Sequence, residues 1–265
     1  MDKKFKDNLG NRMKAYESQE TDRKFIPTLP VYARIDGRSF SKFTKGMQRP
    51  FDPRMTDAMI EVTKYLVKET HAVIGYVQSD EISLLWHQPN TESEIFFDGR
   101  VHKMTSVLAS MASAKLSQVI RGWEPFEDRL PAFDARVISL PNKTEATNMF
   151  LWRSLDATKN AVSMACRHYY SAKQMQNKNQ QQMKDMMKER GVDFDADFPD
   201  SFKYGTFVKK VVVERLLTVK EWLAIPENYR PDPDVGVIRS EMQTYNIQFK
   251  TIIDRDKFIF NPSYL

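Results

Sequence analysis

Two short acidic motifs in this sequence have the residue types of a divalent-metal site. Asp36 ends a β-prone run and is followed by Gly37, and Asp80 with Glu81 follows a later β-prone run. Mg²⁺ prefers oxygen ligands, and a glycine can add its backbone carbonyl because no side chain obstructs the approach. Two such ions, about 4 Å apart, would activate a hydroxyl and neutralise a leaving pyrophosphate. Each motif alone also fits a simple turn or a solvated hairpin tip. The prediction of a metal site therefore depends on the two motifs lying close together in the fold.

Basic and hydroxyl residues near these motifs could bind a triphosphate beside the metal ions. The segment after Gly37 offers backbone N–H groups, two hydroxyls and two cations, and it consists of Arg38, Ser39, Phe40, Ser41 and Lys42. Arg100 and Lys103 lie one turn apart at the start of a predicted helix, where free N–H groups and the helix dipole favour an anion. Two cations on a helix are also what a solvated face contains.

A small set of strands and helices must position these residues. The pattern predicts, in order, a strand, a helix, two strands, a helix and a strand, over residues 31–35, 53–69, 73–77, 82–86, 100–121 and 133–140. This is the split βαββαβ order of ferredoxin-like and polymerase-palm domains, an α+β fold whose antiparallel sheet carries both helices on one face. In that fold the strands that carry Asp36 and Glu81 are neighbours, and the hairpin connection 78–81 brings Asp80 beside them.

The rest of the chain predicts elaborations on that core. We expect one palm-like nucleotidyltransferase domain over residues 1–265, with the catalytic core at about 29–140 and helical and C-terminal elaborations at about 141–265. Within the latter, a helix over 145–171 precedes a polar insertion over 173–200, a strand over 208–217 and a proline-containing tail over 225–265 with weak strand signals. The run Asp193-Phe194-Asp195-Ala196-Asp197 begins like a calcium loop, but Phe198 replaces the required glycine, so a solvated acidic loop is expected.

Composition excludes several other classes of protein. The chain has 265 residues, a net charge of +5 and a pI near 9.1, which permits binding to phosphate groups without requiring it. A single cysteine and four scattered histidines provide no zinc site or disulfide. P-loop, dinucleotide-binding and zincin motifs are absent, as is any apolar run long enough to span a membrane. We therefore expect a cytoplasmic protein without membrane association.

The motifs together resemble the tRNA(His) guanylyltransferase family. The resemblance is carried, in order and spacing, by Arg34-Ile35-Asp36-Gly37-Arg38-Ser39-Phe40, Gln78-Ser79-Asp80-Glu81, Arg100-x-x-Lys103, Phe133-Asp134-Ala135-Arg136-Val137 and Trp152-Arg153. It implies a palm-like catalytic domain that adds nucleotides to the 5′ end of tRNA in the 3′-to-5′ direction. It also implies GTP and ATP as substrates, Mg²⁺ as cofactor, tRNA as partner and a homotetramer.

The same resemblance implies roles for individual residues. Asp36, the carbonyl of Gly37 and Asp80 would hold two Mg²⁺ ions, with Glu81 as a further catalytic carboxylate that supports them. Residues 36–41 and Ser79 would contact the nucleoside triphosphate. Charge neutralisation during phosphoryl transfer would come from Arg38, Lys42, Arg100 and Lys103.

One departure from the family pattern bears on the reaction. Members that add the extra guanosine to eukaryotic tRNA(His) carry His-Ile-Asn-Asn after the Trp-Arg pair, whereas this chain has Thr158-Lys159-Asn160-Ala161. The chain therefore looks like the guanylyltransferase-like branch, which repairs tRNA 5′ ends in a template-dependent reaction. A dedicated tRNA(His) guanylyltransferase and a non-catalytic tRNA-binding module are the alternatives.

Overall fold

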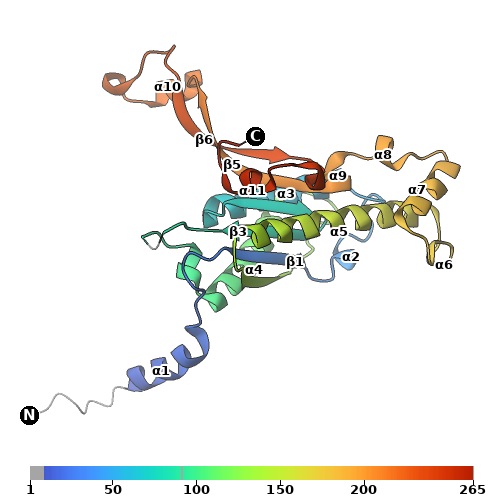
Figure 1. Cartoon of the computed structure of the whole chain (residues 1–265), viewed down its shortest axis with the longest axis horizontal. Coiled ribbons are helices and arrows are strands. Elements are labelled where there is room, and N and C mark those ends of the chain that lie inside the picture. The colour runs from blue at the N-terminus through green and yellow to red at the C-terminus, as the bar shows by residue number, and fades with distance from the viewer. Residues whose placement is uncertain (1–8, 91, 265) are drawn as a thin grey trace, which may run out of the picture.

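An antiparallel sheet positions the predicted site (Figure 1). The computed structural model describes residues 9–90 and 92–264. Within them the sheet has six strands in the order β4-β1-β3-β2-β5-β6. The strands are β1 (Val31–Gly37), β2 (Ile74–Gln78), β3 (Glu81–Trp86), β4 (Phe133–Ser139), β5 (Thr206–Arg215) and β6 (Val237–Tyr245).

The predicted βαββαβ core is confirmed. The strand order β4-β1-β3-β2 is that of the split fold, and α3 (Pro53–Thr70) and α4 (Val101–Val119) share one apolar core with one face of the sheet. Ile35 of β1, Leu66 of α3 and Leu108 of α4 belong to this core and are fully buried. The α+β fold class and the predicted positions of both helices therefore agree with the structure.

A long helix, α5 (Lys143–Tyr169), covers the opposite face of the sheet (Figure 1). Its Phe150 packs edge-to-face against Tyr32 of β1, with ring centres 5.7 Å apart, and Phe207 of β5 joins the same apolar cluster. Because side chains alternate along a strand, residues 32, 34 and 36 of β1 all lie on this face. The face that carries the predicted carboxylates is thus the one that α5 crosses.

The prediction of a polar insertion over residues 173–200 is wrong. The segment folds into short helices that pack against α5, with bounds α6 (Ala172–Met175), α7 (Gln180–Glu189), α8 (Phe194–Asp197) and α9 (Asp200–Tyr204). An apolar pattern recurs every fourth residue at Phe194, Phe198 and Phe202, and these rings are buried together with Met187. The many glutamine and lysine residues of the segment make this pattern hard to recognise in the sequence. The expected acidic loop is instead a capped helix start, because Asp193 accepts a hydrogen bond from the amide of residue 195.

The C-terminal region extends the core sheet. The predicted strand over 208–217 is β5, and the weak signals of the tail correspond to β6, which pairs with β5 over nine residues. The two strands project beyond the sheet as a ribbon that ends near α10 (Figure 1). The remaining elements are α1 (Leu9–Thr21), α2 (Phe40–Phe43), η2 (Phe96–Gly99), α10 (Val219–Ala224), η3 (Glu227–Tyr229), η4 (Phe249–Thr251) and α11 (Arg255–Phe260). None of the described helices is long and apolar enough to cross a lipid bilayer.

Candidate active site

The structure brings both acidic motifs to one end of the sheet. Strands β1 and β3 are hydrogen-bonded neighbours, and Asp36 lies directly opposite Glu81 in their register. Only Ser79 and Asp80 connect β2 to β3, and the amide of Gly37 donates a hydrogen bond to the carbonyl of Asp80 at 3.1 Å. The convergence that the sequence predicts is therefore present in the fold.

Gly37 is required at this point because the hairpin tip lies against its backbone. A Cβ atom at position 37 would lie 2.9 Å from the Cβ of Asp80 and 2.3 Å from the ring of Phe40, both too close. The absence of a side chain lets Asp80 approach the end of β1. Carboxylates and a backbone carbonyl are oxygen ligands that suit Mg²⁺, so the residue types here fit the predicted metal site.

The segment after Gly37 turns sharply into a short helix. Ser39 adopts a left-handed backbone conformation with φ of 55° and precedes α2. The ring of Phe40 is anchored in the core against Phe43 and Phe133, at centroid distances of 4.8 and 5.5 Å. Arg38, Ser39, Ser41 and Lys42 are exposed around this anchor. The buried ring thus holds in place a turn whose polar groups remain free to meet an anion.

Glu81 is held by an arginine from α5. Nε and Nη2 of Arg153 donate to the two carboxylate oxygens of Glu81 at 2.5 and 2.6 Å, and Nε of Arg34 lies 3.9 Å from the same carboxylate. Burial raises the pKa of Glu81, while the hydrogen bonds and charge of Arg153 oppose that rise. Both oxygens of Glu81 are therefore engaged by the guanidinium.

Asp80 is in an environment that disfavours its charge. Burial raises the pKa of Asp80 to about 6, and the charges of Asp36 and Glu81 act in the same direction. A divalent cation between Asp36 and Asp80 would relieve this repulsion. The described residues contain no group of three or more His, Cys, Asp or Glu side chains that could hold a metal ion.

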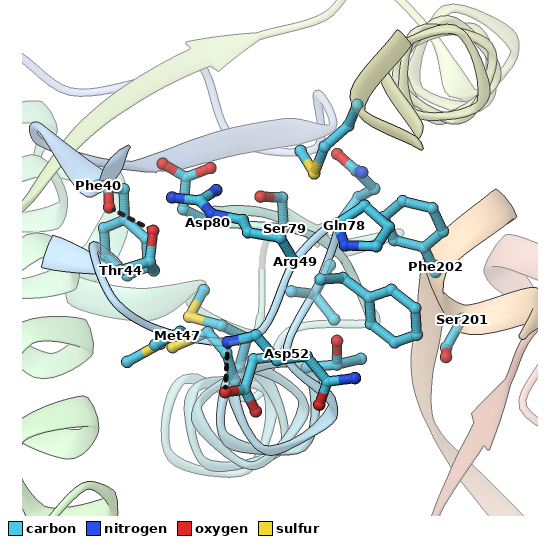
Figure 2. Close-up of a pocket in the computed structure, with 18 of the residues that line it drawn as sticks. Phe40, Thr44, Met47, Arg49, Asp52, Gln78, Ser79, Asp80, Ser201 and Phe202 are labelled. Atoms are coloured by element: carbon cyan, nitrogen blue, oxygen red, sulfur yellow. Dashed lines mark hydrogen bonds between the residues drawn. The ribbon is translucent and has the colours of Figure 1, made fainter. Parts of the chain in front are cut away.

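A cavity of about 430 Å³ adjoins Asp80, which is within the size range of small-molecule sites. Figure 2 shows Ser79 and Asp80 at this cavity together with Phe40, Arg49 and other lining residues. Four of the residues that the sequence singled out line it: Phe40, Ser41, Ser79 and Asp80. A nucleotide bound here would have its phosphates next to the acidic motifs.

Sequence reasoning missed part of this cavity. Residues 47–52 form one wall, including Arg49, and the ring of Phe51 stacks on that of Phe202 at 4.6 Å with an interplanar angle of 21°. Asp52 caps α3 by accepting from the amide of Arg54 at 3.0 Å, which orients the loop. A basic and aromatic loop between two predicted elements was the available signal, but only the fold shows that it faces the hairpin tip.

Arg100 and Lys103 lie elsewhere. Both line a second cavity of about 350 Å³ together with Trp86, and the ammonium of Lys103 lies 5.8 Å from the ring centre of Phe97. Trp86 ends the strand that begins at Glu81, so the two ends are about 17 Å apart. Within one chain, the structure therefore does not bring these two basic residues to the carboxylates.

The raised pKa of Asp80 gives a first testable prediction. The folded protein binds this proton more tightly than the unfolded chain does, so the free energy of unfolding falls as pH rises from about 4 to about 6. The loss should be about 2 kcal/mol in metal-free protein. Asp80→Asn should remove it, which thermal denaturation in EDTA at pH 4.5 and 7 would measure.

Magnesium provides the control for that measurement. At pH 7, Mg²⁺ should raise the melting temperature of the wild type and leave Asp80→Asn nearly unchanged, because the substitution removes a ligand together with the repulsion. An equal Mg²⁺ effect on both proteins would contradict the assignment.

Carboxylates meet at the ends of neighbouring strands of a palm-like sheet, beside a cavity of nucleotide size. This fold and this site together define the protein as a nucleotidyltransferase. Comparison with known proteins agrees. The family model described as tRNAHis guanylyltransferase (Thg1) matches residues 10–141. The chain belongs to this family.

Two solved structures of a bacterial tRNA(His) guanylyltransferase (Thg1)-like protein are similar. The one in complex with ATP has a TM-score of 0.71 and 37% identity, and the match covers 76% of this chain and 88% of that one. The one in complex with GTP has a TM-score of 0.72 and 30% identity over 98% of this chain and 100% of that one. The tRNA(His) guanylyltransferase of Schizosaccharomyces pombe is 29% identical, and the match covers 54% of each protein.

Proposed function

We propose that this protein adds nucleotides to the 5′ end of tRNA in the 3′-to-5′ direction, with Mg²⁺ as cofactor and GTP and ATP as substrates. The observation that carries the proposal is that Asp36 lies opposite Glu81, next to the hairpin tip whose Asp80 lines the cavity with Phe40, Ser41 and Ser79. The bacterial relatives bound to ATP and to GTP support the choice of substrates.

The site residues fall into two groups, those that would contact the nucleotide and those that would hold the metal ions. The cavity would hold the base and ribose, with Ser41, Ser79 and Arg49 facing the phosphates. Asp36, the Gly37 carbonyl and Asp80 would hold two Mg²⁺ ions, which when bound would activate a hydroxyl and neutralise a leaving phosphate. The two hydrogen bonds from Arg153 would hold Glu81 in place behind them.

The reaction would proceed by two in-line phosphoryl transfers. In the first, an oxygen of the RNA 5′-monophosphate attacks the α-phosphorus of ATP or GTP, and pyrophosphate leaves. In the second, the 3′-hydroxyl of the incoming nucleotide attacks the 5′ phosphorus of the activated RNA, loses its proton, and AMP or GMP leaves. Where the new 5′ end carries a triphosphate that is not required, pyrophosphate is then removed. Positioning and charge neutralisation are what such transfers demand of a protein.

We infer that addition is template-dependent. The departure at residues 158–161 removes the residues of the tRNA(His)-dedicated branch, and the remaining Asn160 bonds within its own helix, donating to Asp156 at 3.2 Å. Base pairing with the opposite strand would then select the nucleotide. This supports repair of truncated tRNA 5′ ends over a dedicated guanosine addition.

A primer-type assay tests the proposal. A 5′-truncated tRNA labelled at its 5′ end is incubated with Mg²⁺, ATP for activation and each nucleoside triphosphate in turn. We expect extension only by the nucleotide complementary to the opposite base. Addition of guanosine whatever lies opposite would support the dedicated enzyme, and RNA binding without extension would support a non-catalytic module.

The homotetramer and the cytoplasmic location implied by the family resemblance stay predictions, and the first gives Lys103 a role. Because Lys103 lies far from Asp80 in its own chain, it would contact a nucleotide at that site only across a subunit boundary. Lys103→Met should then raise the KM for the nucleotide about tenfold and leave RNA binding unchanged. An unchanged nucleotide KM in Lys103→Met would place Lys103 outside the site. Sedimentation of the wild-type protein would give the subunit number.

A further inference from the structure

Trp152 is an exposed indole next to the candidate active site. Its side chain is 51% exposed on α5, whereas Trp86 is buried. The guanidinium of Arg153 lies 4.7 Å from the indole ring centre and also donates two hydrogen bonds to Glu81. Only one guanidinium therefore separates the ring from a carboxylate of the site. Tryptophan is enriched at binding interfaces because its large ring can bury much apolar area on contact.

Trp152 does not line the nucleotide cavity, although a later residue of the same helix does. Met164 of α5 lines the cavity and follows Trp152 by twelve residues, which corresponds to about 18 Å of helix. In-line transfer requires the attacking and leaving oxygens on opposite sides of the phosphorus. If one reactant occupies the cavity, the other must approach from elsewhere, and the surface beside Trp152 is open to it.

Two arginines near this surface are candidates for contacting phosphate groups. Arg34 of β1 and Arg136 of β4 are directly opposite in the register, so both lie on the sheet face that α5 crosses. Like charges in such pairs repel unless an anion lies between them. Nε of Arg34 makes no hydrogen bond and lies 3.9 Å from the Glu81 carboxylate, and Arg136 is more than half exposed and forms an ion pair with Asp134 at 3.6 Å.

We propose that Trp152 is a stacking platform for the terminal base of the RNA 5′ end, with Arg34 and Arg136 contacting the adjacent phosphates. The proposal rests on the proposed function in taking RNA as the substrate. Base stacking on an aromatic ring tolerates any base. Such a platform therefore suits an enzyme whose RNA end changes in sequence as nucleotides are added, because the ring holds the end and leaves base selection to the opposite strand.

Binding of a 5′-phosphorylated acceptor-stem hairpin tests this platform. The variants are Trp152→Leu, which removes the aromatic ring, and Trp152→Phe, which keeps one. Leu155→Ala is the matched control, because Leu155 is 47% exposed one turn further along the same helix. We expect Trp152→Leu to weaken hairpin binding about tenfold, and the other two variants to bind within about twofold of wild type. The KM for the nucleotide should stay unchanged in all three.

Fluorescence distinguishes stacking from an indirect effect. The hairpin should quench tryptophan emission in the wild type and lose most of that effect in Trp152→Phe. Wild-type affinity in Trp152→Leu would overturn the proposal, as would a change of subunit number in both Trp152→Leu and Leu155→Ala, which would make the patch a subunit contact. Hairpin binding that depends on Trp152, in a protein that adds no nucleotide, would support the platform and refute the proposed function.

Discussion

Asp36→Asn and Asp80→Asn are each expected to lower the rate of nucleotide addition by about 1,000-fold or more. Asparagine keeps the volume and shape of aspartate, so the local packing at the hairpin tip is retained and only the charged oxygen ligand is lost. The measurement is the single-turnover rate with a 5′-truncated tRNA and saturating nucleotide. Circular dichroism should show an unchanged fold in both variants.

Asp134 provides a matched control for these two substitutions. It lies directly opposite Asp36 on the other neighbouring strand, and its side chain is 55% exposed. Asp134→Asn should retain activity within about threefold, because an exposed carboxylate at this edge is solvated by water. Near-wild-type turnover in Asp36→Asn or Asp80→Asn would remove these residues from the metal site, and a comparable loss in Asp134→Asn would move the site along the sheet.

The same substitution at Asp80 should change activity and stability in opposite directions. Burial and neighbouring charges raise the pKa of this carboxyl, so its ionised form destabilises the metal-free fold at neutral pH. Left-handed backbone at Ser39 and Ser79, on either side of the site, adds strain. Carboxylate repulsion and backbone strain therefore occur together here, as expected of a site that binds a cation and a phosphate group.

The sequence predicted the core of the fold because its signals there are local. Alternating strands, the helix cap at Asp52-Pro53 and the short connection at Ser79 are each set by neighbouring residues. Once the strand order is that of the split fold, register places Asp36 beside Glu81 without further information. The acidic centre was therefore predictable from the motifs and the topology together.

The rest of the site depends on contacts between distant segments. Arg49 and Phe202 line one cavity although they are far apart in the chain, and no local pattern links them. The salt bridge from Arg153 to Glu81 likewise depends on how α5 crosses the sheet. The same limit explains Arg100 and Lys103, because spacing along a helix does not indicate which end of the sheet the helix start will meet.

The second large expected effect is that of removing Arg153, the partner of Glu81, on both stability and activity. The two side chains are 10% and 16% exposed, and the guanidinium binds both carboxylate oxygens. Arg153→Met would leave a buried carboxylate without its partner, which costs about 3 kcal/mol or more. We expect the free energy of unfolding to fall by that amount at pH 7, and nucleotide addition to fall by at least about 100-fold because Glu81 is no longer held in place.

The pH dependence has a definite sign. Without Arg153, the pKa of Glu81 would rise further above its usual range, since burial already raises it and the opposing interactions are gone. The folded state then holds this proton more tightly than the unfolded state, so the deficit of Arg153→Met relative to wild type should grow as pH rises from about 4.5 to 7. Denaturant unfolding at these two pH values measures it.

Two further variants separate the buried pair from ion pairing in general. Arg215, on the projecting ribbon, bonds to Glu221 and Glu241 and is more exposed than Arg153, so Arg215→Met should destabilise the fold less than Arg153→Met does and leave activity intact. In the double variant Glu81→Gln with Arg153→Met, neither member of this pair carries a charge, so most of the lost stability should return while activity stays low. Full activity in the double variant would show that Glu81 and Arg153 only hold the fold together, whereas restored stability without activity would show that the ionised carboxylate acts on the reaction.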